Sequence, residues 1–178
     1  AKIELSQLGG IGIGAPGAVD PKKGFVLEAV NLRWKNQPIA SLLTKKTKVP
    51  TYLDNDVNVA VYGENELGAG KGSKFVLGVW VGTGVGGGLI LNGDLYYGHY
   101  LSAGEIGHTI ILPSNQPGSR SLEHNCSRSA VVERIVRLIR SNRPSSLKAE
   151  MEESGPEKIK SRSLAKAYHD GDALTIEV

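Results

Sequence analysis

The chain has 178 residues, 40% of them hydrophobic, and a formal net charge of +3. This length allows one medium domain or two small lobes with an apolar core, and so mild a charge does not indicate nucleic-acid binding. Cys126 is the only cysteine, so no intrachain disulfide can form, which suits a reducing cytoplasm. No apolar run is long enough to span a membrane and no signal peptide is recognised, so we expect a cytoplasmic protein without a membrane partner.

The first part of the chain alternates between strand and helix patterns. In chain order, this part predicts a buried strand ending in a Gly/Pro turn (residues 9–24), an extended segment (25–32) and a helix (37–49). A second strand (50–56) and a second helix (57–67) follow. A glycine-rich linker follows at residues 68–74. Strands that alternate with helices indicate an α/β fold.

The second part begins with a strand meander and continues as helices. Residues 75–98 predict two strands that flank a glycine loop, and a third strand after the hairpin turn at residues 92–93. Residues 127–141 have the apolar spacing of an amphipathic helix. The polar remainder predicts further helices, interrupted at Pro144 and Pro156.

Both ends of the sequence resemble cut ends. Ala1 stands where a natural chain would begin with Met, and an apolar strand follows almost at once. At the other end, Asp170 or Asp172 is expected to cap a helix that has hardly begun when the chain stops. We therefore expect a piece of a longer protein.

The segment Gly82–Gly88 has five glycines in seven residues between two apolar strands. Glycine permits backbone conformations that turn successive N–H groups toward one point, where a phosphate fits, and the Thr83 hydroxyl can add a hydrogen bond. No Lys-Ser/Thr follows as in a P-loop, and no helix follows as in a dinucleotide fingerprint. A flexible hairpin tip is the alternative, although a hairpin needs only one or two glycines.

Four polar side chains crowd the junction of the second strand and its helix: Asp54, Asn55, Asp56 and Asn58. Either Asp54 or Asp56 has the position of a base that accepts the proton of an attacking sugar hydroxyl. The amides can bind other hydroxyls. The alternative is helix capping by one of the two carboxylates, which this segment alone favours.

A second group of polar residues lies near and after the meander. Glu105, His108 and Glu123 are suited to hydrogen bonding with a polyhydroxylated ligand. A zinc site is the alternative, because His108, His124 and Cys126 are zinc-ligand types. Their spacing is poor and a fourth ligand is lacking, so no metal site is expected.

These motifs, in this order, resemble the ROK family (repressors, open reading frames and sugar kinases) of the actin-like ATPase and sugar kinase group. In chain order, the similar segments are Ile-Gly-Ile-Gly-Ala-Pro-Gly (11–17), Val-Asn-Leu (30–32), Asn-Asp-x-Asn (55–58), the glycine hairpin (80–93), Gly-Glu-x-Gly-His (104–108) and Ser-Leu-Glu (121–123). The resemblance covers about the first three quarters of the chain. It implies an α/β, actin-like (ribonuclease H-like) fold with two lobes around a cleft, here truncated at both ends.

The resemblance also implies roles for residues. Asp56 would be the catalytic base. The sugar would be bound by Asn31, Asn55, Glu105, His108 and Glu123, and the ATP phosphates by Gly82, Thr83, Gly84 and Gly86. Residues 1–72 would belong to the small lobe and residues 73–178 to the large lobe.

The resemblance implies ATP-dependent, Mg²⁺-assisted phosphorylation of a hexose, with glucose the first choice, by a glucokinase-like homodimer. The family's cysteine-rich zinc segment is replaced here by residues 109–121, which contain no cysteine, so zinc is not expected. The family's first phosphate loop and its adenosine-binding segment are also missing from this sequence. The alternative is the sugar-sensing domain of a ROK repressor without kinase activity, whose DNA-binding helices would lie outside this chain.

Overall fold

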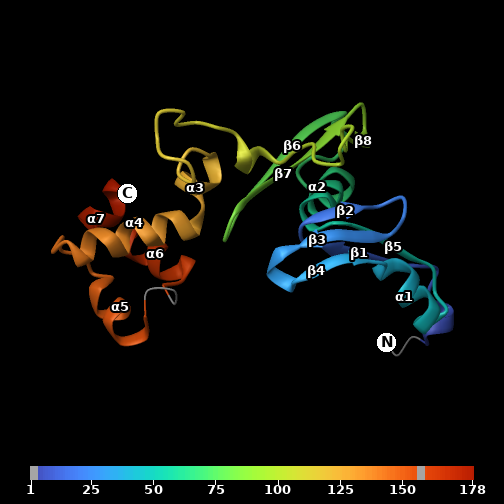
Figure 1. Ribbon diagram of the computed structural model, residues 1–178, viewed down its shortest axis with the longest axis horizontal. Helices are drawn as coiled ribbons and strands as arrows, with labels where there is room; N and C mark the ends of the chain where they lie inside the picture. Colours follow the sequence, from blue (N-terminus) through green and yellow to red (C-terminus); the bar gives the residue numbers. More distant parts are fainter. Residues whose placement is uncertain (1–3, 156–158) are drawn as a thin grey trace. The chain divides into compact units, whose positions relative to one another are not determined.

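The computed structural model describes residues 4–155 and 159–178. The chain forms two compact units: unit 1 lies within Ala1–Trp80 and Gly86–Glu105, and unit 2 within Val81–Val85 and Ile106–Val178. Figure 1 shows the helices and strands of both units. No helix in the described ranges combines the length and the apolar character needed to cross a membrane.

Unit 1 is the mixed α/β part of the chain. Its first elements are η1 (Leu5–Gln7), β1 (Ile11–Ala15), β2 (Ala18–Asp20), β3 (Phe25–Ala29), η2 (Val30–Leu32) and β4 (Trp34–Gln37). There follow α1 (Ile39–Thr47), β5 (Thr51–Asn55), α2 (Asp56–Leu67), β6 (Phe75–Val81), β7 (Val85–Leu91) and β8 (Asp94–Leu95). The predicted strands and helices of this part are confirmed, and the structure adds β2 and β4, which are too short for periodicity to reveal.

The parallel pair β1–β5 is the framework for the polar junction. Ile11 pairs with Thr51 and Ala15 pairs with Asn55, with α1 in the crossover between the strands. Parallel strands end at the same edge of a sheet, so the Pro-Gly turn after β1 and the Asn-Asp turn after β5 are neighbours. A Cβ on Gly14 would lie 3.1 Å from the Cα of Asp56, so the glycine allows this close approach.

A three-stranded antiparallel sheet, β2–β3–β4, completes the first half of unit 1. Small and branched apolar side chains fill the space between it, the β1–β5 pair and α1. The buried members of this core are Ala15, Val19, Val26, Ala29, Ala40 and Leu53.

The β6–β7–β8 sheet packs against α2 (Figure 1). This contact requires glycines on the strand side. A Cβ on Gly86 would lie 2.8 Å from Val57 Cγ2, and one on Gly88 would lie 2.7 Å from Val61 Cγ2. The expectation that all of residues 82–88 form a loop is therefore wrong. The loop is residues 82–84, and the later glycines belong to β7, where they admit the helix.

The turn between β7 and β8 confirms the predicted hairpin. Asn92 and Gly93 both have positive φ, 57° and 94°, as a two-residue primed turn requires. Ile90 pairs with Leu95 across it.

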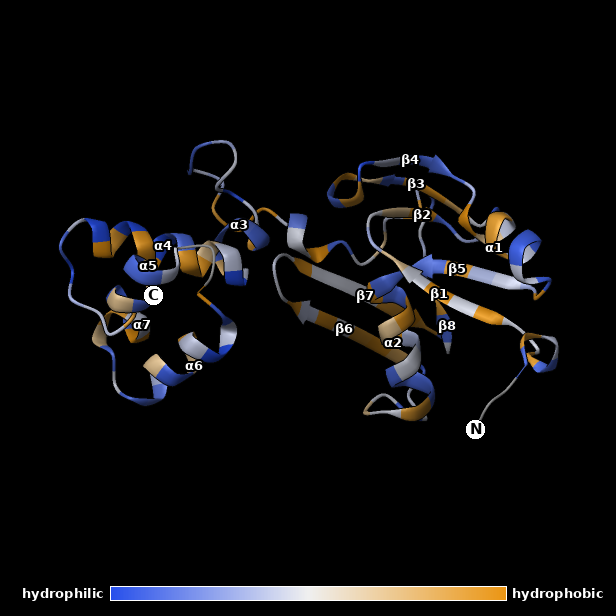
Figure 2. Ribbon diagram, turned by 90° about the horizontal axis from the view of Figure 1, so that it is seen from below, coloured by the Kyte–Doolittle hydropathy of each residue, from blue (hydrophilic) through white to orange (hydrophobic). Residues whose placement is uncertain are grey.

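Unit 2 is mostly helical. It contains η3 (Ile106–His108), α3 (Leu122–Cys126), α4 (Arg128–Arg140), α5 (Lys148–Ser154), α6 (Ser161–His169) and α7 (Ala173–Glu177). The predicted amphipathic helix is α4, whose apolar and polar faces are visible in Figure 2. Its apolar face packs into a core of Val132, Ile135, Val136, Ile139, Leu147, Ile159, Ala167 and Leu174. Pro156, a predicted break, lies outside the described residues.

Asp172 caps α7, as one of the two predicted alternatives. Its carboxylate accepts the N–H of Thr175 (2.8 Å) and the hydroxyl of Ser145 (3.3 Å), and it also accepts the N–H of Ser146. Burial by itself would raise the pKa of Asp172, but the hydrogen bonds from Ser146 and Thr175 outweigh it and hold the pKa well below its usual range. The ionised carboxylate therefore stabilises the folded state.

We expect Asp172→Ala to lower the free energy of unfolding by about 1 kcal/mol at pH 7, the usual cost of a lost N-cap. A group whose native pKa is depressed stabilises above its unfolded value, about 3.9 for Asp, and loses that contribution as the pH falls. The difference between variant and wild type should thus shrink below about pH 4. Urea unfolding at pH 7 and pH 3 measures it, with the exposed Asp170→Ala as control. A difference independent of pH would contradict this role.

Candidate functional site

The β5–α2 junction is held by Asn55. Its Oδ1 accepts the N–H groups of Val57 (2.9 Å) and Asn58 (3.2 Å), so Asn55 is the N-cap of α2. The expectation that Asp54 or Asp56 caps this helix is therefore wrong. The Nδ2 of Asn55 donates to the carbonyl of Gly17 (3.1 Å), which leaves its second amide hydrogen available to a ligand.

The two carboxylates of the junction have different surroundings. Oδ1 of Asp54 accepts the N–H of Asn55 (2.7 Å) and Nδ2 of Asn58 (3.3 Å), and its Oδ2 accepts the Tyr97 hydroxyl (2.6 Å). Three donors occupy this carboxylate, so it is poorly placed to take a proton from a substrate. Asp56 is exposed at the first turn of α2, and its Oδ1 accepts only a local bond from the N–H of Val57 (3.0 Å) within the described structure. Asp56 is the better candidate base.

The Pro-Gly turn after β1 packs against the end of β3, which precedes Asn31 in the chain. A Cβ on Gly17 would lie 2.2 Å from the carbonyl oxygen of Glu28 and 3.0 Å from the Cα of Ala29. Gly17 therefore lies directly against the end of β3, and the exposed Asn31 follows on η2. The backbone of this turn links Asn55 to the segment that carries Asn31.

Glu105 ends unit 1 on a segment pressed against β7. Gly104 has φ +90°, and a Cβ there would lie 2.6 Å from the carbonyl oxygen of Gly87 and 2.9 Å from the Cα of Gly88. A side chain at residue 104 would thus overlap the backbone of β7. The exposed Glu105 follows directly, so its position depends on this contact.

In unit 2, the loop between β6 and β7 is joined to Glu123. Oε2 of Glu123 accepts the N–H of Val85 (2.8 Å), and a Cβ on Gly84 would lie 2.3 Å from the same oxygen. Gly84 thus makes room for the carboxylate under the loop. The other carboxylate oxygen, Oε1, is 3.7 Å from that Cβ position and can accept a hydrogen bond from a ligand.

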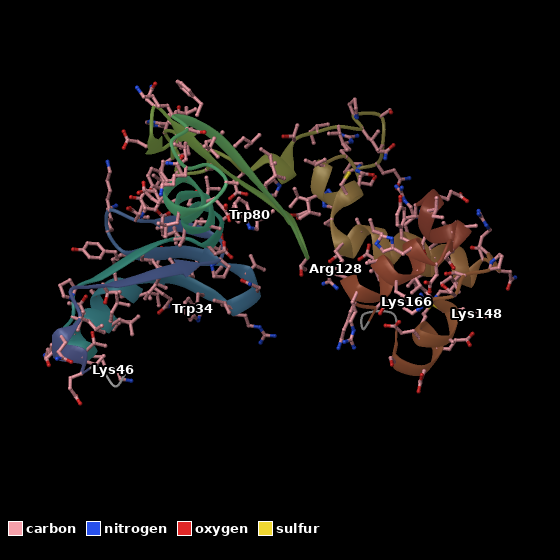
Figure 3. The ribbon with its side chains drawn as sticks, turned by 180° about the vertical axis from the view of Figure 1, so that it is seen from behind. Trp34, Lys46, Trp80, Arg128, Lys148 and Lys166 are labelled. Atoms are coloured by element: carbon pink, nitrogen blue, oxygen red, sulfur yellow. The ribbon has the colours of Figure 1, made fainter. Side chains whose placement is uncertain are left out.

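Arg128 joins the tip of this loop to α4. Its N–H donates to the carbonyl of Gly82 (2.9 Å), and its guanidinium donates to the Thr83 hydroxyl (3.3 Å). Figure 3 shows Arg128 beside the tip of the hairpin. Because the guanidinium donates, the Thr83 hydroxyl hydrogen is free to bind an anion, and Arg128 adds a positive charge there.

His108 lies on η3 near the same loop. A Cβ on its neighbour Gly107 would lie 2.1 Å from the carbonyl oxygen of Val85, and the N–H of Leu122 donates to the carbonyl of Thr109 (2.9 Å). Unit 2 therefore gathers His108, Glu123 and the Thr83 loop, three of the predicted sites. In the described ranges, no three His, Cys, Asp or Glu side chains are grouped as metal ligands.

A polar cavity of about 560 Å³ opens beside Thr83 in unit 2. Its walls come from the loop, from α3 and from the first turns of α4. The charged side chains among its lining residues are Glu123, Glu133, Arg134 and Arg137. The arginines give it a partly basic wall, which suits an anionic ligand.

Tyr97 and Arg128 were missed by sequence reasoning. For Arg128 a signal existed, because a cation in the first turn of a helix is unfavourable to the helix dipole unless its side chain serves another contact. For Tyr97 the sequence offers no comparable signal, since its partner Asp54 lies 43 residues away.

The chain has the mixed α/β fold of the actin-like sugar kinase group, to which its structural neighbours belong. The sequence matches the ROK family over residues 1–178, and the chain belongs to that family. The fold class expected from the sequence is thereby confirmed.

Known relatives include both enzymes and repressors. The chain is 40% identical to a glucokinase from Halalkalibacterium halodurans over 131 residues (74% of this chain, 38% of the relative), and 43% identical to a xylose repressor from Caldicellulosiruptor bescii over 103 residues (57% and 26%). Its structure is similar to a ROK family glucokinase from Streptomyces griseus solved with glucose and AMPPNP, with a TM-score of 0.80 and 28% identity (96% and 56%). The chain thus spans little more than half of this glucokinase structure, and less of the two sequence relatives.

Proposed function

We propose that the complete natural protein carrying this chain transfers the γ-phosphoryl group of ATP to a hydroxyl of a hexose, with glucose the favoured acceptor. The observation that carries the proposal is the β5–α2 junction, where the exposed Asp56 stands next to a fully engaged Asp54 and a fixed Asn55. An exposed carboxylate in the first turn of a helix that follows a rigid strand suits the deprotonation of a bound sugar hydroxyl. Similarity to glucokinases supports the choice of acceptor.

In the proposed reaction, the Asp56 carboxylate accepts the proton of the sugar hydroxyl as its oxygen attacks the γ-phosphorus. The bond from that phosphorus to the β,γ-bridging oxygen breaks, and ADP leaves. Asn31, Asn55, Glu105, His108 and Glu123 would bind the other hydroxyls, using for example the remaining amide hydrogen of Asn55 and Oε1 of Glu123.

The proposed phosphate cradle is Gly82, Thr83, Gly84 and Gly86, with Arg128 beside it. The N–H of Gly82 already donates to the carbonyl of Gly84 (2.8 Å) and Gly86 lies in β7, so the donors proposed for the phosphates are chiefly the Thr83 hydroxyl and the Arg128 guanidinium. Mg²⁺ would supply charge neutralisation of the phosphates. Mg²⁺ commonly binds through one or two carboxylates and substrate phosphates. The proposal assigns residues 1–72 to the small lobe and 73–178 to the large lobe.

We also propose a cytoplasmic homodimer. Cytoplasmic ATP is the donor that the reaction needs, and the free, exposed thiol of Cys126 is stable in a reducing compartment. The pairing rests on the resemblance to the ROK family alone.

The second candidate is the sugar-sensing domain of a repressor, favoured by the 43% identity to a xylose repressor. ADP release by the complete protein, measured with glucose, N-acetylmannosamine, fructose and xylose, separates the two. A kinase should release ADP with at least one hexose, fastest with glucose. Sugar binding by calorimetry without ADP release would overturn the kinase proposal in favour of a sensor.

A further inference from the structure

The Tyr97 hydroxyl connects two segments that are far apart in the sequence. Tyr97 is the second residue after β8, and its hydroxyl donates to Oδ2 of Asp54 (2.6 Å), the penultimate residue of β5. Burial, then the hydrogen bond to Asp54 and its negative charge, raise the pKa of Tyr97 above its usual range. The phenol therefore stays protonated at neutral pH and remains a donor.

At one end of this bond lies the junction that presents Asp56. Asp54 also accepts the N–H of Asn55 and a hydrogen of Asn58 Nδ2. The Asp54 carboxylate therefore connects the Tyr97 hydroxyl to Asn55, the N-cap of α2. Asn58 lies in the first turn of α2, is only 9% exposed, and is linked to Asp54 by this hydrogen bond. A change in the orientation of Asp54 would be passed to Asn55 and from there to Asp56.

At the other end lies the segment that carries Glu105. The carbonyl of Tyr97 accepts the N–H of Ala103 (3.0 Å), which closes residues 97–103 into a loop. The next residue, Gly104, presses on the backbone of β7, and Glu105 follows. Tyr97 is thus the first residue of the loop that places Glu105.

We propose that Tyr97 is a positioning residue. Its hydrogen bond to Asp54 fixes the position of the loop bearing Glu105 relative to the turn bearing Asn55 and Asp56. The inference rests on the proposed function for the claim that these groups bind a sugar. It adds a residue that touches no substrate and acts through Asp54.

The test is Tyr97→Phe in the complete protein, which removes the hydroxyl and keeps the ring. We expect the KM for glucose to rise about tenfold or more, the size of effect for a lost hydrogen bond to a charged group, with a smaller change in kcat. Without the bond, amide hydrogen exchange in the sugar-free protein should accelerate at residues 54–58 and 97–105. The matched control is Tyr96→Phe, because Tyr96 is 48% exposed and should show neither change.

A double-mutant cycle with Asp54→Asn isolates the pair. If the two side chains act together, Tyr97→Phe should have little further effect on exchange or sugar affinity once Asp54 has been replaced. Additive effects would overturn the proposal, as would unchanged exchange in Tyr97→Phe or exchange accelerated equally along the whole chain. Hydrogen exchange, and sugar affinity measured by calorimetry, need no turnover. A protein that binds sugar without releasing ADP would therefore refute the proposed kinase activity, and the positioning role of Tyr97 could still be tested.

Discussion

Asp56→Asn should reduce kcat for ADP release about 10³-fold, because it removes the carboxylate that accepts the proton of the attacking hydroxyl. The amide is nearly isosteric, and the cap of α2 comes from Asn55, so the helix should form as before. Glucose affinity, measured by calorimetry, should stay within about threefold of wild type, since the groups proposed to bind the sugar remain. The expected pattern is lost turnover with retained binding.

Two other aspartates serve as comparisons. Asp94→Asn, on the exposed edge of β8, should leave turnover unchanged. Asp54→Asn should act mainly on sugar affinity, because Asp54 is occupied by three donors. If Asp56→Asn retained turnover within about tenfold of wild type, a smaller loss than a general base accounts for, Asp56 would not be the base. A larger loss of kcat in Asp54→Asn than in Asp56→Asn would transfer the role to Asp54.

Gly104→Ala should lower the free energy of unfolding by about 2–4 kcal/mol. Two effects add here: a φ of +90° that L-residues avoid, and a Cβ 2.6 Å from the carbonyl oxygen of Gly87. That neighbour is backbone in β7, so it cannot rotate away as a side chain would. Because Glu105 comes next, glucose affinity should fall as well, even at temperatures where the variant is folded.

Urea unfolding and calorimetry on the same samples measure both effects. Gly12→Ala is the matched control, because a Cβ at Gly12 meets no atom within 4 Å in the described structure and the residue lies in a strand. Its stability should stay within about 0.5 kcal/mol of wild type. A Gly104→Ala protein as stable as the Gly12→Ala protein would show that the contact with β7 yields at little cost.

Local sequence patterns predict secondary structure elements, whereas contacts between distant residues leave no such pattern. Hydrophobic spacing predicted α1, α2 and α4, the strands β5 and β6 and the last residues of β7, because these segments repeat their apolar residues at the period of a helix or form short apolar runs. The Asn92-Gly93 turn was predicted for a similar reason, since positive φ at two successive positions restricts the residue types. The roles assigned to Asp56, Asn31, Glu105, His108 and Glu123 came from motif order, and they stay predictions.

From the residues alone one can predict an α/β chain of the ROK family, with a polar strand–helix junction and a glycine-rich hairpin. Which of the polar residues are accessible to a ligand follows only from how the chain packs. Asp54 and Asp56 are chemically equal in the sequence, but Tyr97 and Asn58 occupy the first and leave the second exposed. Likewise Gly86 and Gly88 looked like parts of a loop until α2 was seen to pack on them. The cause is the same in both cases. Hydrogen-bond partners and steric neighbours come from residues distant in the chain, and the spacing within a motif does not predict them.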